Sequence, residues 1–232
     1  MEASDASQSY AACGEGETGM NTATQEVAGQ HRYRHQPPSL YVVASFYDWL
    51  TDVSADLAQA VVRDPDAVDD ARQREIARAL TAESRLLDQG ALVNEAYEHW
   101  LALYAEECAY WIPAGSPAPD PRHAVTLEFH DRRRLLDRVA RLRTGLAFSQ
   151  FPTSRTARQW SGLEVWPSAG RSDEWRARYS FTLVESREGH NRVLAGWNGF
   201  VVRQIGDHLR IVLKQVNLID NESPQGNNSF FL

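Results

Sequence analysis

Apolar residues recur at helical spacing in the first part of the chain and at alternating spacing in the last part. Over residues 70–89, Ile76, Leu80 and Leu87 share one face and charged residues occupy the other, which predicts an amphipathic helix that ends at Gly90. The same spacing criteria predict three further helices, over residues 40–59, 92–105 and 127–143.

The helix predicted over residues 127–143 is unusually rich in arginine. Leu135, Val139 and Leu142 form its apolar line, which we expect to be buried. The other side is expected to face water, and it carries five arginines: Arg132, Arg133, Arg134, Arg138 and Arg141.

The chain after Arg155 has the pattern of β-structure, because apolar and polar residues alternate. One strand face would carry four apolar residues: Ala177, Tyr179, Phe181 and Leu183. Turn signals separate long strands at Glu188-Gly189 and at Ile205-Gly206-Asp207. With a short strand over 108–113, the predicted order from residue 70 on is helix, helix, strand, helix and four long strands. This order predicts an α+β fold with an antiparallel sheet that curls around helices.

Three regions differ in composition along the 232 residues. Residues 1–38 hold few large apolar groups, so they cannot offset the entropy of ordering, and we predict a disordered tail. Residues 39–72 are predicted to form a helical N-terminal extension. Residues 73–232 are predicted to form the main domain.

Charge and cysteine content exclude several classes of protein. The formal net charge is −7 and the sequence pI is about 5.5, which argues against general nucleic-acid binding. No apolar run reaches the roughly 18 residues of a membrane span. The first residues, MEASDAS, lack the apolar stretch of a secretory signal. Because Cys13 and Cys108 are far apart, we expect no disulfide framework and a cytoplasmic location.

Candidate chemical groups are present, but they are scattered. Two isolated cysteines do not provide an iron–sulfur or zinc site. A mononuclear iron site of the two-His, one-carboxylate type would have to use four neighbours in sequence: His123, Glu128, His130 and Asp131. An acid–base pair would have to combine Asp131 or Glu164 with one of five histidines: His99, His123, His130, His190 and His208. We therefore expect no catalytic, cofactor or metal site in this chain.

Aromatic residues leave two interpretations open. Five tryptophans lie on or beside predicted strands, where core packing and protein–protein contact explain them equally well: Trp111, Trp160, Trp166, Trp175 and Trp197. The chain closes with NNSFFL, and exposure of its three apolar residues would be unfavourable. We expect Phe230, Phe231 and Leu232 to dock on the chain's own sheet or on a neighbouring chain.

Residues 141–158, RLRTGLAFSQFPTSRTAR, resemble a signature of the small (beta) subunits of aromatic-ring-hydroxylating dioxygenases, the Rieske non-haem iron oxygenases. The matching positions are Arg141, Arg143, Ala147, Phe148, Pro152, Ser154, Arg155 and Arg158. The segments ESRLLDQG, HWLALYAEECAYWIPAG and VNLIDNESPQGNNSFFL resemble other family segments in the same order. The resemblance covers about residues 73–232.

The resemblance implies a cone-like fold of the nuclear transport factor 2 type, in which a strongly curved, mainly antiparallel sheet wraps around N-terminal helices. It also implies a non-catalytic subunit that assembles and stabilises an oxygenase in the degradation of an aromatic compound. The Rieske [2Fe-2S] cluster and the mononuclear Fe(II) would belong to a large (alpha) subunit, supplied with electrons from NAD(P)H through a reductase. Three alpha chains would join three copies of this chain.

The interface hypothesis that follows names seven residues: Arg141, Arg143, Arg155, Arg158, Trp111, Phe230 and Phe231. Arginine and tryptophan are enriched at protein–protein contacts. Two other functions stay open on the same fold. One is a stand-alone dehydratase or isomerase that uses His99, His123 and Asp131, and the other is a binding module for a small ligand.

Overall fold

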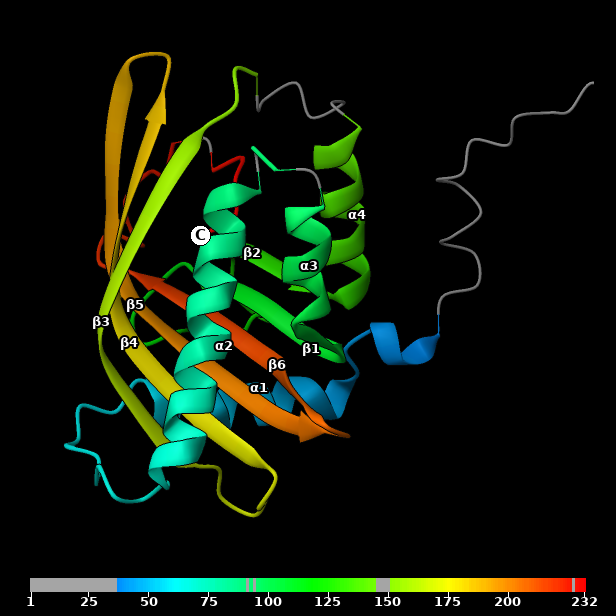
Figure 1. Cartoon of the computed structure of the whole chain (residues 1–232), viewed down its shortest axis with the longest axis vertical. Helices are drawn as coiled ribbons and strands as arrows, with labels where there is room; N and C mark the ends of the chain where they lie inside the picture. Colours follow the sequence, from blue (N-terminus) through cyan, green and yellow to red (C-terminus); the bar gives the residue numbers. More distant parts are fainter. Residues whose placement is uncertain (1–36, 91, 94, 145–150, 227) are drawn as a thin grey trace, which may run out of the picture. The chain divides into compact units, whose positions relative to one another are not determined.

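A six-stranded sheet is the central element of the structure (Figure 1). The strand order is β2-β1-β6-β5-β4-β3, and all neighbouring pairs are antiparallel except β1 and β6, which are parallel. The strands are β1 (Tyr104–Pro113), β2 (Thr126–Asp131), β3 (Arg155–Pro167), β4 (Glu174–Arg187), β5 (His190–Ile205) and β6 (His208–Leu218). The long strands bend around α2 (Asp70–Gln89), so one face of the sheet is concave.

The computed structural model describes residues 37–232 apart from 91, 94, 145–150 and 227. These residues belong to one unit, Pro37–Leu232. The tail predicted over residues 1–38 lies outside the described residues except for Pro37 and Pro38, and Pro38 begins a short 3-10 helix, η1 (Pro38–Leu40). The domain boundary expected at residue 73 stays a prediction.

The concave face of the sheet packs on α2 as the sequence pattern predicts. The four alternating residues of β4, Ala177 to Leu183, are all buried. Helix α2 has the predicted bounds, and the Asp69 side chain caps it by accepting a hydrogen bond from the Arg72 amide at 3.0 Å. Its buried stripe of Ile76, Leu80 and Leu87 faces the sheet core.

Helix α1 (Ala44–Leu57) lies on the opposite, outer face of the sheet, which the sequence did not predict. Helix α1 contacts the β4 side chains that point away from the concave face. For example, Asp56 of α1 pairs with Arg176 of β4. Gly199 lies opposite Arg178 in the register, and a Cβ there would come within 2.9 Å of Leu57. Glycine at this position therefore lets α1 approach the sheet closely.

The helix predicted over residues 92–105 is wrong at both ends. Helix α3 spans only Ala96–Ala102. Beyond it, Tyr104 is already in β1, where it pairs with Ile211 of β6. Pairing with a strand more than a hundred residues away ends the helix there, although the apolar spacing continues.

The helix predicted over residues 127–143 is also too long. Residues Thr126–Asp131 form β2, which pairs with β1. Helix α4 (Arg132–Arg143) begins where the Asp131 carboxylate accepts a hydrogen bond from the Arg134 amide at 2.8 Å. Leu135 and Val139 are buried, as expected, and Leu142 is partly buried.

The expected α+β class and the curved, mainly antiparallel sheet are confirmed. In the part of the chain that the structure describes, no helix combines the length and the apolar character needed to span a bilayer.

Candidate functional site

A buried ion pair lies between α2 and the concave face of the sheet. Lys214 of β6 donates to Glu83 Oε1 at 2.7 Å, and the two side chains are 1% and 0% exposed. Trp100 Nε1 of α3 donates to the same carboxylate oxygen at 2.9 Å. Burial lowers the pKa of Lys214, and the adjacent Glu83 carboxylate opposes that shift. The pair therefore ties α2, α3 and β6 together in the core.

The last residues of the sequence dock on this buried pair. Lys214 Nζ donates to the main-chain oxygen of Leu232 at 2.7 Å, and the Tyr110 hydroxyl donates to the same oxygen at 3.1 Å. The Leu232 amide in turn donates to the Tyr110 hydroxyl oxygen at 2.8 Å. The Phe231 ring lies 4.4 Å from the Trp100 ring and is 1% exposed. Of the two docking places that the sequence left open, the structure shows the chain's own sheet.

Two arginines hold the same segment from the sides. Arg158 of β3 donates to the Phe231 carbonyl and pairs with Asp88 of α2. Arg138 of α4 donates to the Phe230 carbonyl at 2.9 Å and lies 4.3 Å from the centre of the Phe231 ring. Both therefore act inside the described chain, as links between helices and the segment at residues 230–232.

Arg132 and Arg138 depart from the prediction that all five α4 arginines face water. Arg132 is half-buried and donates to the Leu101 main-chain oxygen. The second case is Arg138. Its side chain is 11% exposed and pairs with Glu128 of β2. It also lies 3.0 Å from His130 Nε2. The apolar periodicity of α4 did not reveal this, because the partners come from β2 and from the far end of the chain.

The interior residues form a structural core. Lys214 bonds to Glu83 and to Leu232 in it, and residues Phe230–Leu232 are buried there. Glu83 Oε2, Tyr104 Oη and Asn198 Oδ1 are buried without a hydrogen-bond partner. Burial raises the pKa values of Tyr104 and Tyr110 well above the ordinary range, so both hydroxyls stay protonated.

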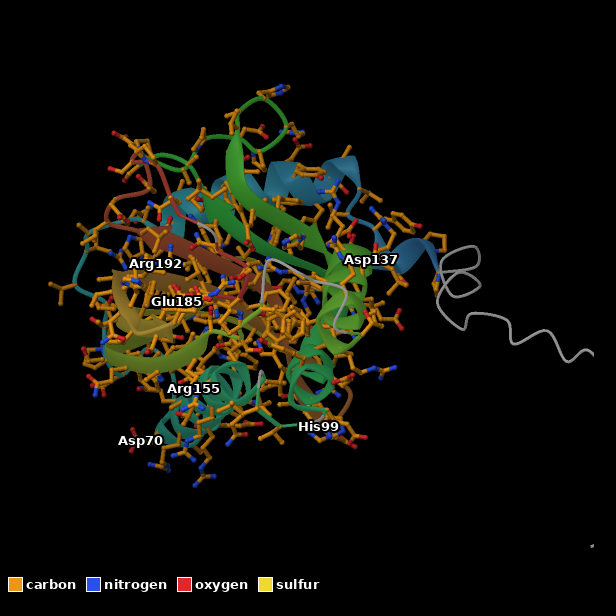
Figure 2. All side chains as sticks on the ribbon, turned by 90° about the horizontal axis from the view of Figure 1, so that it is seen from above. Asp70, His99, Asp137, Arg155, Glu185 and Arg192 are labelled. Carbon is orange, nitrogen blue, oxygen red and sulfur yellow. The ribbon has the colours of Figure 1, made fainter. Side chains whose placement is uncertain are left out.

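The residues of the interface hypothesis fall into two groups. Arg141 and Arg155 are exposed, and the exposed Arg143 pairs with Glu98 at 3.1 Å (Figure 2 labels Arg155). The other four lie within the chain: Arg158, Trp111, Phe230 and Phe231. Trp111 donates from Nε1 to Thr126 Oγ1 at 3.0 Å. Two motif positions, Ala147 and Phe148, lie outside the described residues.

The histidines proposed for acid–base chemistry do not come together. His99 of α3 and His123 are exposed, and His190 and His208 lie exposed at the starts of β5 and β6 (Figure 2 labels His99). Asp131 is used as the cap of α4. The arrangement required for a dehydratase or isomerase with a His99, His123 and Asp131 site is therefore not formed.

His130 and Glu128 are the two members of the proposed iron set that lie close together, 3.4 Å apart. Across residues 37–232, leaving out the gaps, no three side chains of His, Cys, Asp or Glu are grouped to bind a metal ion. Burial raises the pKa of Cys108 to about 12, so this thiol is not a nucleophile near neutral pH. Cys13 lies outside the described residues.

Asp56 of α1 links the outer helix to the sheet. It accepts hydrogen bonds from Arg176 and, at 2.9 Å, from Trp166 Nε1, and it lies 3.3 Å from Arg63. Burial opposes ionisation of Asp56, but these hydrogen bonds outweigh it and hold the pKa of the carboxyl below its ordinary value. The ionised form therefore stabilises the folded chain.

We expect Asp56→Asn to lower the free energy of unfolding by about 1–2 kcal/mol at neutral pH, because hydrogen bonds to a charged group are lost. A carboxyl with a lowered folded pKa contributes above its unfolded pKa of about 4, and loses that contribution as the pH falls through the folded value. The difference between the two proteins should therefore vanish in acid. Urea unfolding from pH 7 to pH 3 measures it, and a difference that grows in acid would contradict the assignment.

Sequence reasoning missed Glu83, Asp88 and Lys214. A signal existed for two of them. Glu83 lies on the apolar stripe of α2 between Leu80 and Leu87, and Lys214 is the single lysine of the chain, within the apolar run of β6. A charged residue on each buried face indicates a pair, although the sequence does not say that they meet.

Known proteins match most of the chain that the structure describes. The family model described as "Ring hydroxylating beta subunit" matches residues 82–223. The small oxygenase component of the p-cumate 2,3-dioxygenase system of Pseudomonas putida is 30% identical over 162 residues, which are 68% of this chain and 86% of that protein. The beta subunit of benzoate 1,2-dioxygenase of Acinetobacter baylyi is 28% identical over 149 residues, 62% of this chain and 84% of that one.

A similar fold occurs in a crystal structure. The beta subunit of benzoate 1,2-dioxygenase from Burkholderia mallei superposes with a TM-score of 0.54 at 24% identity, over 71% of this chain and 98% of that chain. At this identity the likeness concerns the fold.

Proposed function

The chain belongs to the ring-hydroxylating beta-subunit family, and from this membership we propose that it is the small subunit of a multicomponent aromatic-ring-hydroxylating dioxygenase. The observation that carries the proposal is the family match over residues 82–223. It spans α3, β1 and the arginine-rich stretch at 141–158, which resembled this family from sequence. In this role the chain assembles and stabilises the oxygenase and carries no catalytic centre.

The catalytic groups of the enzyme would belong to a large (alpha) subunit. We assign the Rieske [2Fe-2S] cluster and the mononuclear Fe(II) to it, because the described part of this chain offers no suitable ligand group. The iron would activate O₂, with electrons from NAD(P)H delivered by a reductase. The assembly would hold three large and three small subunits in the cytoplasm.

The subunit interface would use the exposed arginines of the family motif. Arg141, Arg143 and Arg155 present guanidinium groups that pair with carboxylates in planar, bidentate geometry. The buried members of the set, Arg158, Trp111, Phe230 and Phe231, would support this surface from within by fixing β1, β3 and the segment at residues 230–232.

The substrate of the assembled enzyme would be an aromatic carboxylate. Benzoate and p-cumate appear in the names of the two relatives, and both are aromatic carboxylates. Ring recognition would lie in the large subunit, so this chain would affect substrate range through assembly. Benzoate and p-cumate are therefore the first substrates to test.

We expect the purified chain alone to bind no iron and to oxidise neither compound, whereas co-expression with its large subunit should give an active complex. Iron analysis, mass measurement and oxygen uptake test this. His99→Ala and His123→Ala should leave the activity of the complex nearly unchanged, because both side chains are exposed. Turnover by the isolated chain, abolished by either change, would refute the proposal in favour of a stand-alone enzyme.

A further inference from the structure

An open groove runs along the exposed side of α2. It has a volume of about 600 Å³, and the described residues that line it come from this helix: Arg74, Ala77, Arg78, Thr81, Ala82, Arg85, Leu86 and Gln89. Small and apolar side chains and three arginines line it together. Arg74 lies 3.6 Å from Asp70, but the structure gives Arg78 and Arg85 no partner among the described residues. Apolar side chains beside two unpaired arginines fit an occupant with apolar and acidic groups together.

The loop before α2, at residues 61–66, carries both apolar and acidic side chains. Val61 and Val62 of this loop are 47% and 100% exposed, and such exposure is unusual for two adjacent valines. Asp64 and Asp66 follow them, both exposed, and neither forms an ion pair in the described structure. Figure 2 shows the nearby Asp70, where this loop enters α2, at the edge of the molecule. Two apolar and two acidic side chains therefore project from one short segment.

The loop is held in a defined conformation, although its tip is exposed. Arg63 lies over the Trp166 ring at 4.1 Å and pairs with Asp56 at 3.3 Å. Gln73 Nε2 donates to the Pro65 and Val68 carbonyls, each at 2.7 Å. A loop fixed in this way loses little conformational freedom when it binds.

We propose that the α2 groove of one copy of this chain receives the Val61–Asp66 loop of a second copy. The groove and the loop are two different surfaces of one chain, and the full exposure of Val62 shows that the loop does not cover the groove of its own copy. Contacts between two different surfaces join copies head to tail, and they form a ring when the rotation between copies closes. A ring of three copies agrees with the three small subunits of the assembly proposed above. The inference rests on that proposed function only in assuming that the chain associates with copies of itself.

This contact is distinct from the motif surface of Arg141, Arg143 and Arg155. The loop and the first half of the groove precede residue 82, where the match to the family begins. The contact is therefore a property of this chain's own N-terminal region.

Charge reversal tests the contact in the full chain, with mass measured by sedimentation over a series of concentrations. The groove variant Arg78→Glu/Arg85→Glu and the loop variant Asp64→Arg/Asp66→Arg should each weaken self-association at least about 100-fold, since close interfacial charge pairs couple strongly. The chain that carries all four changes should recover association, because its groove and loop are again opposite in charge. Glu188→Arg/Asp207→Arg, with the same charge change on two other exposed turns, serves as the control and should associate normally.

A wild-type chain that stays monomeric alone and enters the complex as a single copy overturns the inference. Charge-reversed variants that associate like wild type also overturn it. The same holds if the variant with all four changes folds normally but does not recover self-association. Unfolding midpoints establish folding for each variant. Copurification of the large subunit and oxygen uptake are measured in parallel. If these fail while the charge pattern holds, the proposed function is wrong and the self-contact stands.

Discussion

Replacement of Lys214 by Met is expected to lower the free energy of unfolding of the isolated chain by about 3–5 kcal/mol. The change removes the ammonium group from Glu83, which is 0% exposed, and leaves an unpaired charge in the core. It also removes one donor to the Leu232 main-chain oxygen. Urea unfolding, monitored by circular dichroism at one protein concentration, measures the loss of stability.

A double variant separates the charge effect from the loss of packing. Glu83→Gln combined with Lys214→Met removes both charges and keeps an acceptor for Trp100 Nε1. This protein should recover much of the stability, since removal of both partners leaves no buried charge. Arg171→Met, which breaks an exposed pair with Asp173, is the matched control and should change little. A Lys214→Met protein as stable as wild type would show that the pair is not intact in solution.

Replacement of Phe231 by Ala should be comparably severe, with a loss of about 3–5 kcal/mol in unfolding free energy. The ring contacts Trp100 at 4.4 Å and lies 5.7 Å from both Tyr97 and Tyr110, measured between ring centres. Its removal opens a cavity between α3, β1 and the segment that Arg138 and Arg158 hold. Urea unfolding compares the variant with wild type, and yield of the complex with the large subunit should fall with stability.

Phe151→Ala provides the matched control for this prediction. The Phe151 side chain is 58% exposed, so the same truncation removes little buried surface. Equal stability losses for the two variants would mean that the Phe231 ring is not packed in the core. Phe231→Leu should retain part of the stability, because a large apolar group still fills the site.

Local pattern was sufficient for elements whose partners are near in sequence. Strands β4 and β5 have strong periodicity and pair with each other, and their positions were predicted. Helix α2 was predicted because its amphipathic pattern is strong, although its partners on the sheet are distant in sequence. Prediction failed at residues 103–105 and 127–131. There, apolar spacing is compatible with a helix, and pairing with β6 and β1 decides in favour of strands.

The interior contacts were beyond local pattern for the same reason. Glu83 and Lys214 are 131 positions apart, and Arg158 and Phe231 are 73 apart. The motif indicated that Arg158 matters, but it did not indicate whether its partner is another chain or Asp88 and the Phe231 carbonyl of the same chain. The helix pattern predicted the exposure of Arg141, whereas the exposure of Arg155 required the structure.

Because the single lysine of the chain, Lys214, is buried, its chemical reactivity reports when the core around it opens. Amine-directed reagents have no other lysine side chain to modify, and at 1% exposure Lys214 is shielded from them in the folded chain. Its rate of acylation would therefore follow the release of residues 230–232 from the core, without any introduced label. Surface attachment through lysine would fail for the same reason.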